Sequence, residues 1–230
     1  MSTASTISAP AVCWACNATL AESPLLCPSC GKVQRASDVD YFRVFGLPRS
    51  LSLDASLLEQ EFHRLSRKLH PDRFARASEN EQQASLANTA LLNDAYRTLR
   101  EPVQRTEYLL RLEGLKIGEE HSGKGKSVDR QPPADLLEEV FELNMQLEEM
   151  RMNQKMGEND SALQADLIAA RNKFQSLLDG VDGDLAVNGA QWDAGDKETR
   201  DAAAKMMAAL LDRRRYLRNL VRDVNEVLGA

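Results

Sequence analysis

Apolar side chains recur at helical spacing along most of the chain, and this pattern predicts an all-α fold. One clear row consists of Leu58, Phe62, Leu65 and Leu69. These positions follow i, i+4, i+7 and i+11, the repeat of one face of an amphipathic helix. The helix is expected to begin near Asp54 or Ser56. Pro71 ends it, because the residue before a proline is disfavoured in the α region.

Further helices are predicted around this one. A short helix at 41–46 ends at Gly46, a glycine suited to a helix C-terminus. A long helix spans 78–100 and stops before Pro102, and a shorter helical segment follows at 103–112. Together with the amphipathic helix, these segments form a helical domain at 38–112.

The second half of the chain is expected to form a small antiparallel bundle of three helices. A polar stretch that contains glycines and Pro132-Pro133 separates it from the first half and predicts a linker at 113–133. Within the bundle domain, 134–230, we expect helices at 134–156, 160–179 and 197–228, with breaks at 157–160 and 180–195. Trp192 is expected to anchor the last break to the bundle. The N-terminal residues divide into a disordered tail at 1–12 and a cysteine-containing module at 13–37.

Composition narrows the class of protein further. Of 230 residues, 43% are hydrophobic and only 5% are aromatic, which argues against a β-sandwich or barrel. No apolar run approaches the length of a membrane span, and no signal or transit peptide is visible, so we expect a protein of the cytoplasm, bacterial rather than mitochondrial. The net charge of −6 arises after residue 112. An acidic C-terminal half disfavours nucleic acid as a partner.

Four cysteines predict a metal-binding module. They form two Cys-x-x-Cys pairs, Cys13 with Cys16 and Cys27 with Cys30. Each pair presents two thiolates on one tight turn, and two such turns make a tetrahedral cage of four sulfurs. One zinc ion is the favoured occupant. It would be structural, because sulfur fills every position and leaves none open for catalysis. An iron centre of the rubredoxin type and a pair of disulfides are the alternatives.

A His-Pro-Asp tripeptide at 70–72 joins two of the predicted helices. Arg64, Arg67 and Lys68 precede it, on the face of the helix opposite the apolar row. A helix that ends in Arg-Lys-Leu-His, then Pro-Asp-Arg-Phe, then a helix with Asn-Asp-Ala-Tyr-Arg-Thr-Leu at 93–99 resembles the J-domain. The resemblance covers 38–112.

This resemblance implies docking on the ATPase domain of a seventy-kilodalton heat-shock chaperone, with acceleration of its ATP hydrolysis. A proline fixes a rigid turn, the aspartate can take a bidentate arginine pair, and the basic side chains can steer onto an acidic surface. The implied contact residues are His70, Pro71, Asp72, Arg64, Arg67, Lys68 and Arg73. No nucleophile or second titratable group accompanies the histidine, so we predict no enzymatic activity.

The helix at 134–156 carries more apolar side chains than one core-facing row requires. The row expected to face the bundle is Leu136, Val140, Leu143, Leu147 and Met150. A second row, Leu137, Phe141 and Met145, lies roughly 100° around the helix. Beside it lie Glu138, Glu142 and Glu149. The second row either packs on another helix or against the domain at 38–112, or forms a protein-binding surface with an acidic rim.

A second resemblance bears on that choice. The segment LLEEVFELNMQLEE at 136–149 is similar to the start of the C-terminal domain of the HscB family, J-type co-chaperones of iron–sulfur cluster assembly. The segments YLLRL at 108–112 and RYLRNL at 215–220 also fit, and the tetracysteine module resembles that of the longer, zinc-bearing members. The resemblance implies binding of an iron–sulfur scaffold protein through Leu137, Glu138, Phe141, Glu142, Met145 and Tyr216.

These observations predict an adaptor that binds the scaffold protein and delivers it to the ATPase chaperone. The main alternative is a general J-domain co-chaperone for unfolded clients, in which case the second row would be buried. A zinc-ribbon nucleic-acid binder and an iron-based redox centre are further alternatives, and the acidic C-terminal half disfavours the first of these.

Overall fold

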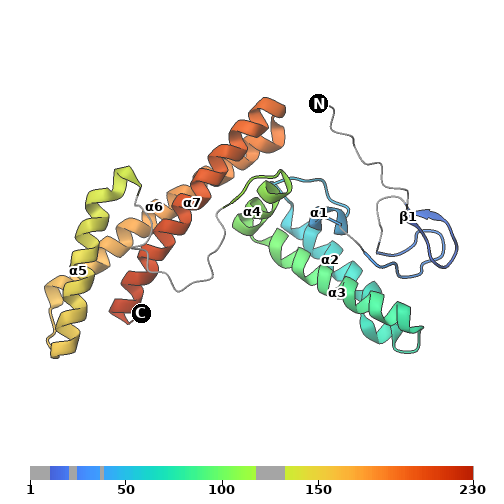
Figure 1. The fold of residues 1–230 in the computed structure, drawn as a ribbon, viewed down its shortest axis with the longest axis horizontal. Coiled ribbons are helices and arrows are strands. Elements are labelled where there is room, and N and C mark those ends of the chain that lie inside the picture. The colour runs from blue at the N-terminus through green and yellow to red at the C-terminus, as the bar shows by residue number, and fades with distance from the viewer. Residues whose placement is uncertain (1–10, 21–24, 37–38, 118–132, 230) are drawn as a thin grey trace. The chain divides into compact units, whose positions relative to one another are not determined.

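The computed structural model describes residues 11–20, 25–36, 39–117 and 133–229, and Figure 1 shows that helices dominate these ranges. Most of the predicted tail, 1–10, and most of the predicted linker, 118–132, lie outside them. The chain divides into two compact units, Met1–Arg105 and Thr106–Ala230. The expected all-α class is confirmed. The β structure of the described residues lies in the cysteine module: a two-stranded antiparallel pair, β1 (Ala11–Val12) and β2 (Thr19–Leu20), and an isolated bridge between Leu26 and Val33.

A helical hairpin forms the centre of the first unit. The hairpin consists of α2 (Ala55–Leu69) and α3 (Glu79–Arg100), which lie antiparallel in Figure 1, and the short helix α1 (Tyr41–Val44) precedes it. α2 begins close to the expected position, and Asp54 caps it, because its carboxylate accepts hydrogen bonds from the amides of Ser56 and Leu57. The buried leucines of the hairpin are Leu58, Leu65, Leu69, Leu92 and Leu99. Next comes α4 (Pro102–Leu112), which spans the boundary between the two units.

Three long helices build the second unit: α5 (Leu137–Met156), α6 (Ser161–Ala194) and α7 (Lys197–Leu228). A 3₁₀ turn, Ala134–Leu136, precedes α5. The predicted core row of α5 is confirmed, since all five of its members are buried. α6 and α7 lie side by side along their length (Figure 1). Within the described residues, no helix combines the length and the hydropathy needed to cross a bilayer.

The predicted break at 180–195 is wrong, because α6 continues without interruption to Ala194. Its buried positions keep a helical repeat through this stretch: Phe174, Leu178, Val181, Leu185, Gly189 and Trp192. Gly180 and Gly183 lie on the exposed side instead. A helical glycine costs about 1 kcal/mol, whereas burying one large apolar side chain contributes about 1.5–3 kcal/mol, so packing against α7 outweighs the glycines.

Trp192 therefore lies in the last turns of a helix and not in a loop. Its side chain is buried, and the Arg200 guanidinium lies 5.0 Å from the centroid of its ring. The backbone carbonyl of Trp192 also accepts a hydrogen bond from Arg200 Nε at 3.1 Å. This residue fixes the end of α6 to the beginning of α7.

Candidate functional site

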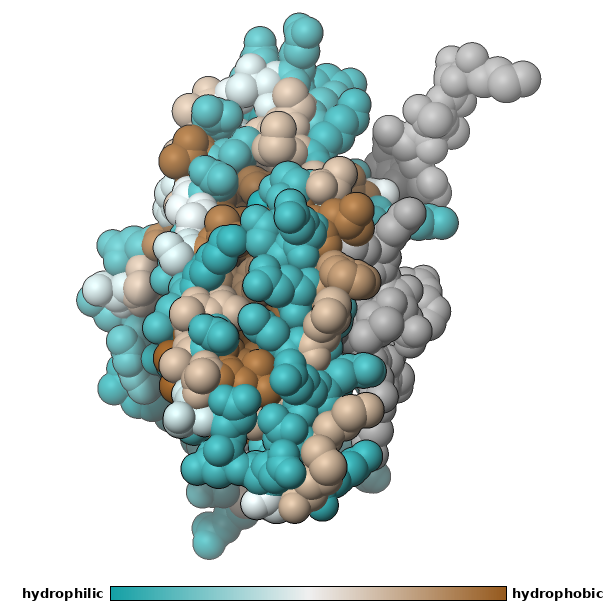
Figure 2. Space-filling view, turned by 90° about the vertical axis from the view of Figure 1, so that its left-hand side faces the viewer, coloured by the Kyte–Doolittle hydropathy of each residue, from teal (hydrophilic) through white to brown (hydrophobic). Residues whose placement is uncertain are grey.

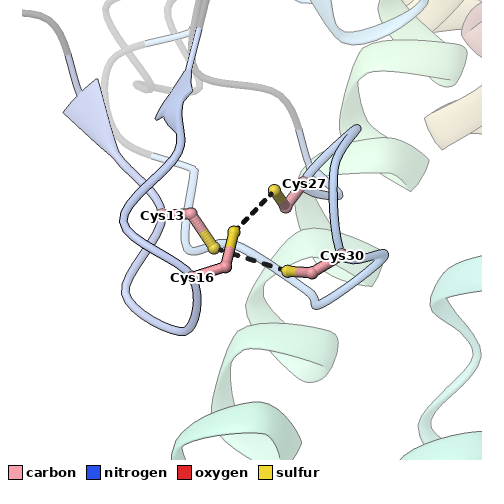
Figure 3. A group of neighbouring side chains, drawn as sticks. All are labelled: Cys13, Cys16, Cys27 and Cys30. Carbon is pink, nitrogen blue, oxygen red and sulfur yellow. Dashed lines mark hydrogen bonds between the residues drawn. The ribbon is translucent and has the colours of Figure 1, made fainter.

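The four cysteines converge on one point, with all their sulfurs within 4.8 Å of one another (Figure 3). Cys13 Sγ lies 3.7 Å from Cys30 Sγ, and Cys16 Sγ lies 3.8 Å from Cys27 Sγ. A tetrahedron with metal–sulfur bonds of about 2.3 Å has sulfurs about 3.8 Å apart, so the cage has the size of a zinc or iron site. These separations are far above a disulfide bond of about 2.05 Å, and all four thiols are free.

Two similar turns place the sulfurs. In the first turn the Asn17 amide donates to the Cys13 carbonyl at 2.9 Å, and in the second the Gly31 amide donates to the Cys27 carbonyl at 2.9 Å. Asn17 and Gly31 both adopt a positive φ, 55° and 72°, which asparagine and glycine tolerate best. The indole of Trp14 donates to the Val33 carbonyl at 2.8 Å and so ties the two turns together.

The thiols are held too close together to ionise independently. Desolvation acts to raise the pKa of Cys13, but hydrogen bonds from the backbone amides of Ala15 and Cys16 outweigh it and lower that pKa to about 6. The amide of Ala18 acts to lower the pKa of Cys16, but the neighbouring thiol of Cys30 and desolvation raise it to about 12. A bound cation would favour the thiolate form of all four groups, as a structural zinc ion does.

The His-Pro-Asp segment forms an exposed turn on a buried anchor. It opens a 3₁₀ turn, Pro71–Phe74, between α2 and α3. The side chains of His70 and Asp72 are 54% and 89% exposed, and His70 Nδ1 accepts a hydrogen bond from the Asp72 amide at 3.3 Å. Leu69, just before it, is buried. The turn therefore presents its polar side chains outward from a fixed point.

Exposed basic side chains surround this turn. Arg64, Arg67, Lys68 and Arg73 are all exposed. Arg64 pairs with Glu61 on the same helix, at 2.5 Å between Nη2 and Oε2. Among the residues that the structure describes, no ion pair involves the other three. Their charges are available to an acidic partner surface.

The second row on α5 is exposed. Leu137, Phe141 and Met145 are 58%, 68% and 60% exposed, and Glu138 and Glu142 beside them are also exposed. Figure 2 views the molecule from the side on which α5 lies in Figure 1, and it shows hydrophobic side chains scattered among hydrophilic ones on this face. Within the second unit, this row is therefore not buried against another helix.

The structure separates Tyr216 from that row and adds two methionines to it. Tyr216 is buried in α7, and this burial raises the pKa of its hydroxyl, so its side chain does not form part of the exposed surface. Met152 and Met156 are 61% and 64% exposed. They lie 7 and 11 positions after Met145, which is close to two and three helical turns, so the spacing alone could have revealed them.

A helical hairpin with an exposed His-Pro-Asp turn defines a J-domain protein. Residues 40–108 match the family described as the DnaJ domain. The match begins just before α1 and ends within α4, and therefore contains α2, the turn and α3.

Relatives extend the similarity beyond the J-domain. A co-chaperone protein HscB homolog from Vibrio vulnificus is 36% identical over 154 residues, which cover 67% of this chain and 83% of the relative. The structure of chaperone HscB from Vibrio cholerae has a TM-score of 0.53 and 27% identity, and covers 83% of this chain and 98% of that one. The crystal structure of human co-chaperone protein HscB has a TM-score of 0.64 and 25% identity, with 94% and 98% coverage. The chain belongs to the HscB family of J-domain co-chaperones.

Proposed function

We propose that this co-chaperone binds an iron–sulfur cluster scaffold protein through α5 and delivers it to a seventy-kilodalton heat-shock ATPase chaperone. The turn at 70–72 and the basic side chains of α2 dock on the chaperone and stimulate its ATP hydrolysis. One structural zinc ion occupies the cage of four cysteines. The protein acts in the bacterial cytoplasm, without catalysis of its own.

The observation that carries this proposal is the exposure of the second row on α5. Five large apolar side chains, Leu137, Phe141, Met145, Met152 and Met156, are each more than half exposed on one helix. Isolated exposed apolar residues are ordinary, but a row of them with a charged rim is typical of a protein interface. Because the rim includes Glu138 and Glu142, a partner with apolar residues inside a basic border fits it.

Tyr216 has a different part in this proposal. Its side chain is buried in the second unit. On the same helix, α7, Arg213 forms a bidentate ion pair with Asp135, just before α5, at 2.9 and 2.7 Å. Because it is buried, Tyr216 is expected to stabilise the second unit and not to contact the scaffold protein directly.

The test is a calorimetric titration of the full chain with an iron–sulfur scaffold protein. Wild type should bind, and the double variant Leu137→Ala/Phe141→Ala should lose about 2 kcal/mol or more, roughly a thirtyfold loss of affinity, because truncated interface anchors have costs of this size. Helical circular dichroism should remain unchanged, since both side chains are exposed.

A matched control uses apolar side chains of similar exposure elsewhere in the same unit. Val187 on α6 and Met206 on α7 are 56% and 53% exposed, so Val187→Ala/Met206→Ala should bind as wild type does. Absence of binding by the wild type would overturn the scaffold role. Binding of unfolded polypeptides that follows their hydrophobicity and is unchanged in Leu137→Ala/Phe141→Ala would favour the general co-chaperone instead.

A further inference from the structure

The cysteine module packs directly on α3 of the J-domain. Asn88, in the middle of α3, is 1% exposed. Its Nδ2 donates to the backbone carbonyl of Gln34 at 2.7 Å and reaches that of Leu25 at 3.5 Å, while its Oδ1 accepts from the amide of Ala36 at 3.3 Å. A single side chain of α3 thus holds the backbone of the module at three points.

An ion pair makes a second connection at the first turn of α3. Lys32 Nζ lies 2.8 Å from Glu81 Oε1, and the other carboxylate oxygen accepts a hydrogen bond from Ser78 Oγ at 3.0 Å. The hydrogen bond from Lys32 lowers the pKa of Glu81 below its ordinary value, which keeps this buried carboxylate charged at neutral pH. The beginning of α3 is therefore also tied to the module.

Gln34 connects these contacts to the cage. Its side chain is buried, and its Nε2 donates to Cys13 Sγ at 3.4 Å and to the Lys32 carbonyl at 2.9 Å. The carbonyl of Gln34 is the one that Asn88 binds at 2.7 Å. The position of this residue, and with it the main contact to α3, depends on the geometry of the four sulfurs.

The neighbouring face of α3 holds the exposed turn of the J-domain. Ser85 Oγ donates to the Leu69 carbonyl at 2.6 Å, and Thr89 Oγ1 donates to the same carbonyl at 3.3 Å. Leu69 immediately precedes His70. Ser85 and Thr89 lie within a turn of Asn88 on the same helix, so one stretch of α3 contacts both the cysteine module and the anchor of the turn.

We propose that the metal-loaded cysteine module stabilises α3 and, through α3, the turn at 70–72, so that the local stability of this turn depends on metal occupancy. Without a metal, the two cysteine turns lose their cross-link, because the binding free energy of a structural metal is folding free energy. Asn88 and Glu81 then lose their hydrogen bonds to the module, because those partners are ordered only when the module is folded. The local stability of the first half of α3 falls as a result.

The test is hydrogen exchange of the full chain, followed by mass spectrometry, with the metal bound and after its removal by a chelator. Removal should speed exchange in 25–36, in 79–89 and in 69–74, by roughly tenfold or more where buried hydrogen bonds are lost. Exchange in α6 and α7 should not change and serves as the internal control. Unchanged exchange in 79–89 after complete removal of the metal would overturn the proposal.

Variants distinguish this local stabilisation of α3 from a general loss of stability. Asn88→Ala should retain one metal ion per chain, while its exchange in 69–74 should depend less on that metal than that of wild type, because only the Lys32–Glu81 connection remains. Gln83→Ala is the matched control, because Gln83 is exposed on the same helix and its side chain donates to Glu79. It should respond to the metal as wild type does.

If Asn88→Ala does not fold, Lys32→Ala makes the same comparison from the module side, since the Lys32 side chain is 48% exposed. Its exchange in 79–89 should depend less on the metal than that of wild type. A folded, metal-loaded Asn88→Ala or Lys32→Ala protein with the full wild-type dependence would contradict the proposal.

Discussion

His70 has few contacts within the protein, so its role can be tested without disturbing the fold. Its side chain is 54% exposed and meets the amide and carboxylate of Asp72, its neighbour across Pro71. We expect His70→Gln to abolish stimulation of the chaperone's ATP hydrolysis while the thermal unfolding curve stays the same. Steady-state ATPase assays with a seventy-kilodalton chaperone measure the first effect. A folded variant that stimulates fully would remove this turn from the mechanism.

Asp135 provides a test of stability against pH. Its carboxylate accepts two hydrogen bonds from Arg213, which lower its pKa below the ordinary value of 3.8. The folded protein therefore binds this proton more weakly than the unfolded chain. The contact contributes its full stability above the unfolded pKa, about 4, and loses it as the pH falls through the lower folded value.

Asp135→Asn should therefore be less stable than wild type at neutral pH, and the difference should shrink as the pH falls below about 4. Urea unfolding at a series of pH values, followed by circular dichroism, measures this. Asp166→Asn, at an exposed carboxylate of α6, is the control and should show no such convergence. A constant gap between Asp135→Asn and wild type at every pH would mean that the ion pair does not contribute.

Individual residues also show how far the sequence alone could lead. The four sulfur ligands and the exposed turn follow from local spacing, and the structure brings the cysteines together as that spacing predicts. Contacts of Asn88 and Glu81 with the module do not follow, because their partners lie about fifty residues away along the chain. A signal was present nevertheless: both are polar residues on the same helix face as Ser85 and Leu92, where periodicity predicts core.

At the scale of elements, helix positions were predictable where caps and apolar rows agree. Asp54 and Pro71 bracket α2 as expected, and α3 begins one residue after its expected start at Ser78. The extent of α6 was not predictable from glycine content, because α6 is stabilised by packing on α7, the next helix along the chain, and local propensity does not register that contact. Tertiary packing overrides local propensity there.

Replacing glycine by alanine should have opposite effects on stability inside α6 and at the C-terminal end of α5. A Cβ added at Gly180 or Gly183 meets no atom within 4 Å, and both residues are helical. Gly180→Ala and Gly183→Ala should each raise the free energy of unfolding by about 0.5–1 kcal/mol, because alanine loses less backbone entropy on folding. Denaturant unfolding measures this change.

Gly157 supplies the contrast. Space around it is equally open, but it ends α5 with φ +73°, a conformation that strains any residue with a Cβ. Gly157→Ala should therefore lower the free energy of unfolding. If all three alanines had the same sign, backbone conformation would not be the cause.

For the whole molecule, the division into two compact units predicts that its two binding activities are independent. His70 and its basic neighbours lie in the first unit, whereas Leu137 and Phe141 lie in the second. Mutations at distant sites that share no partners have additive effects. His70→Gln should therefore bind the scaffold protein with wild-type affinity, and Leu137→Ala/Phe141→Ala should stimulate the ATPase chaperone as wild type does when no scaffold is present.

Calorimetry and ATPase assays on both variants, and on a protein that carries all three substitutions, test this independence. Additive losses in the combined protein would mean that the adaptor holds its two partners through separate surfaces, so that delivery depends on the connection between the units. A loss of scaffold affinity in His70→Gln would contradict independence. It would require the turn at 70–72 to influence α5, a coupling that the contacts within either unit do not provide.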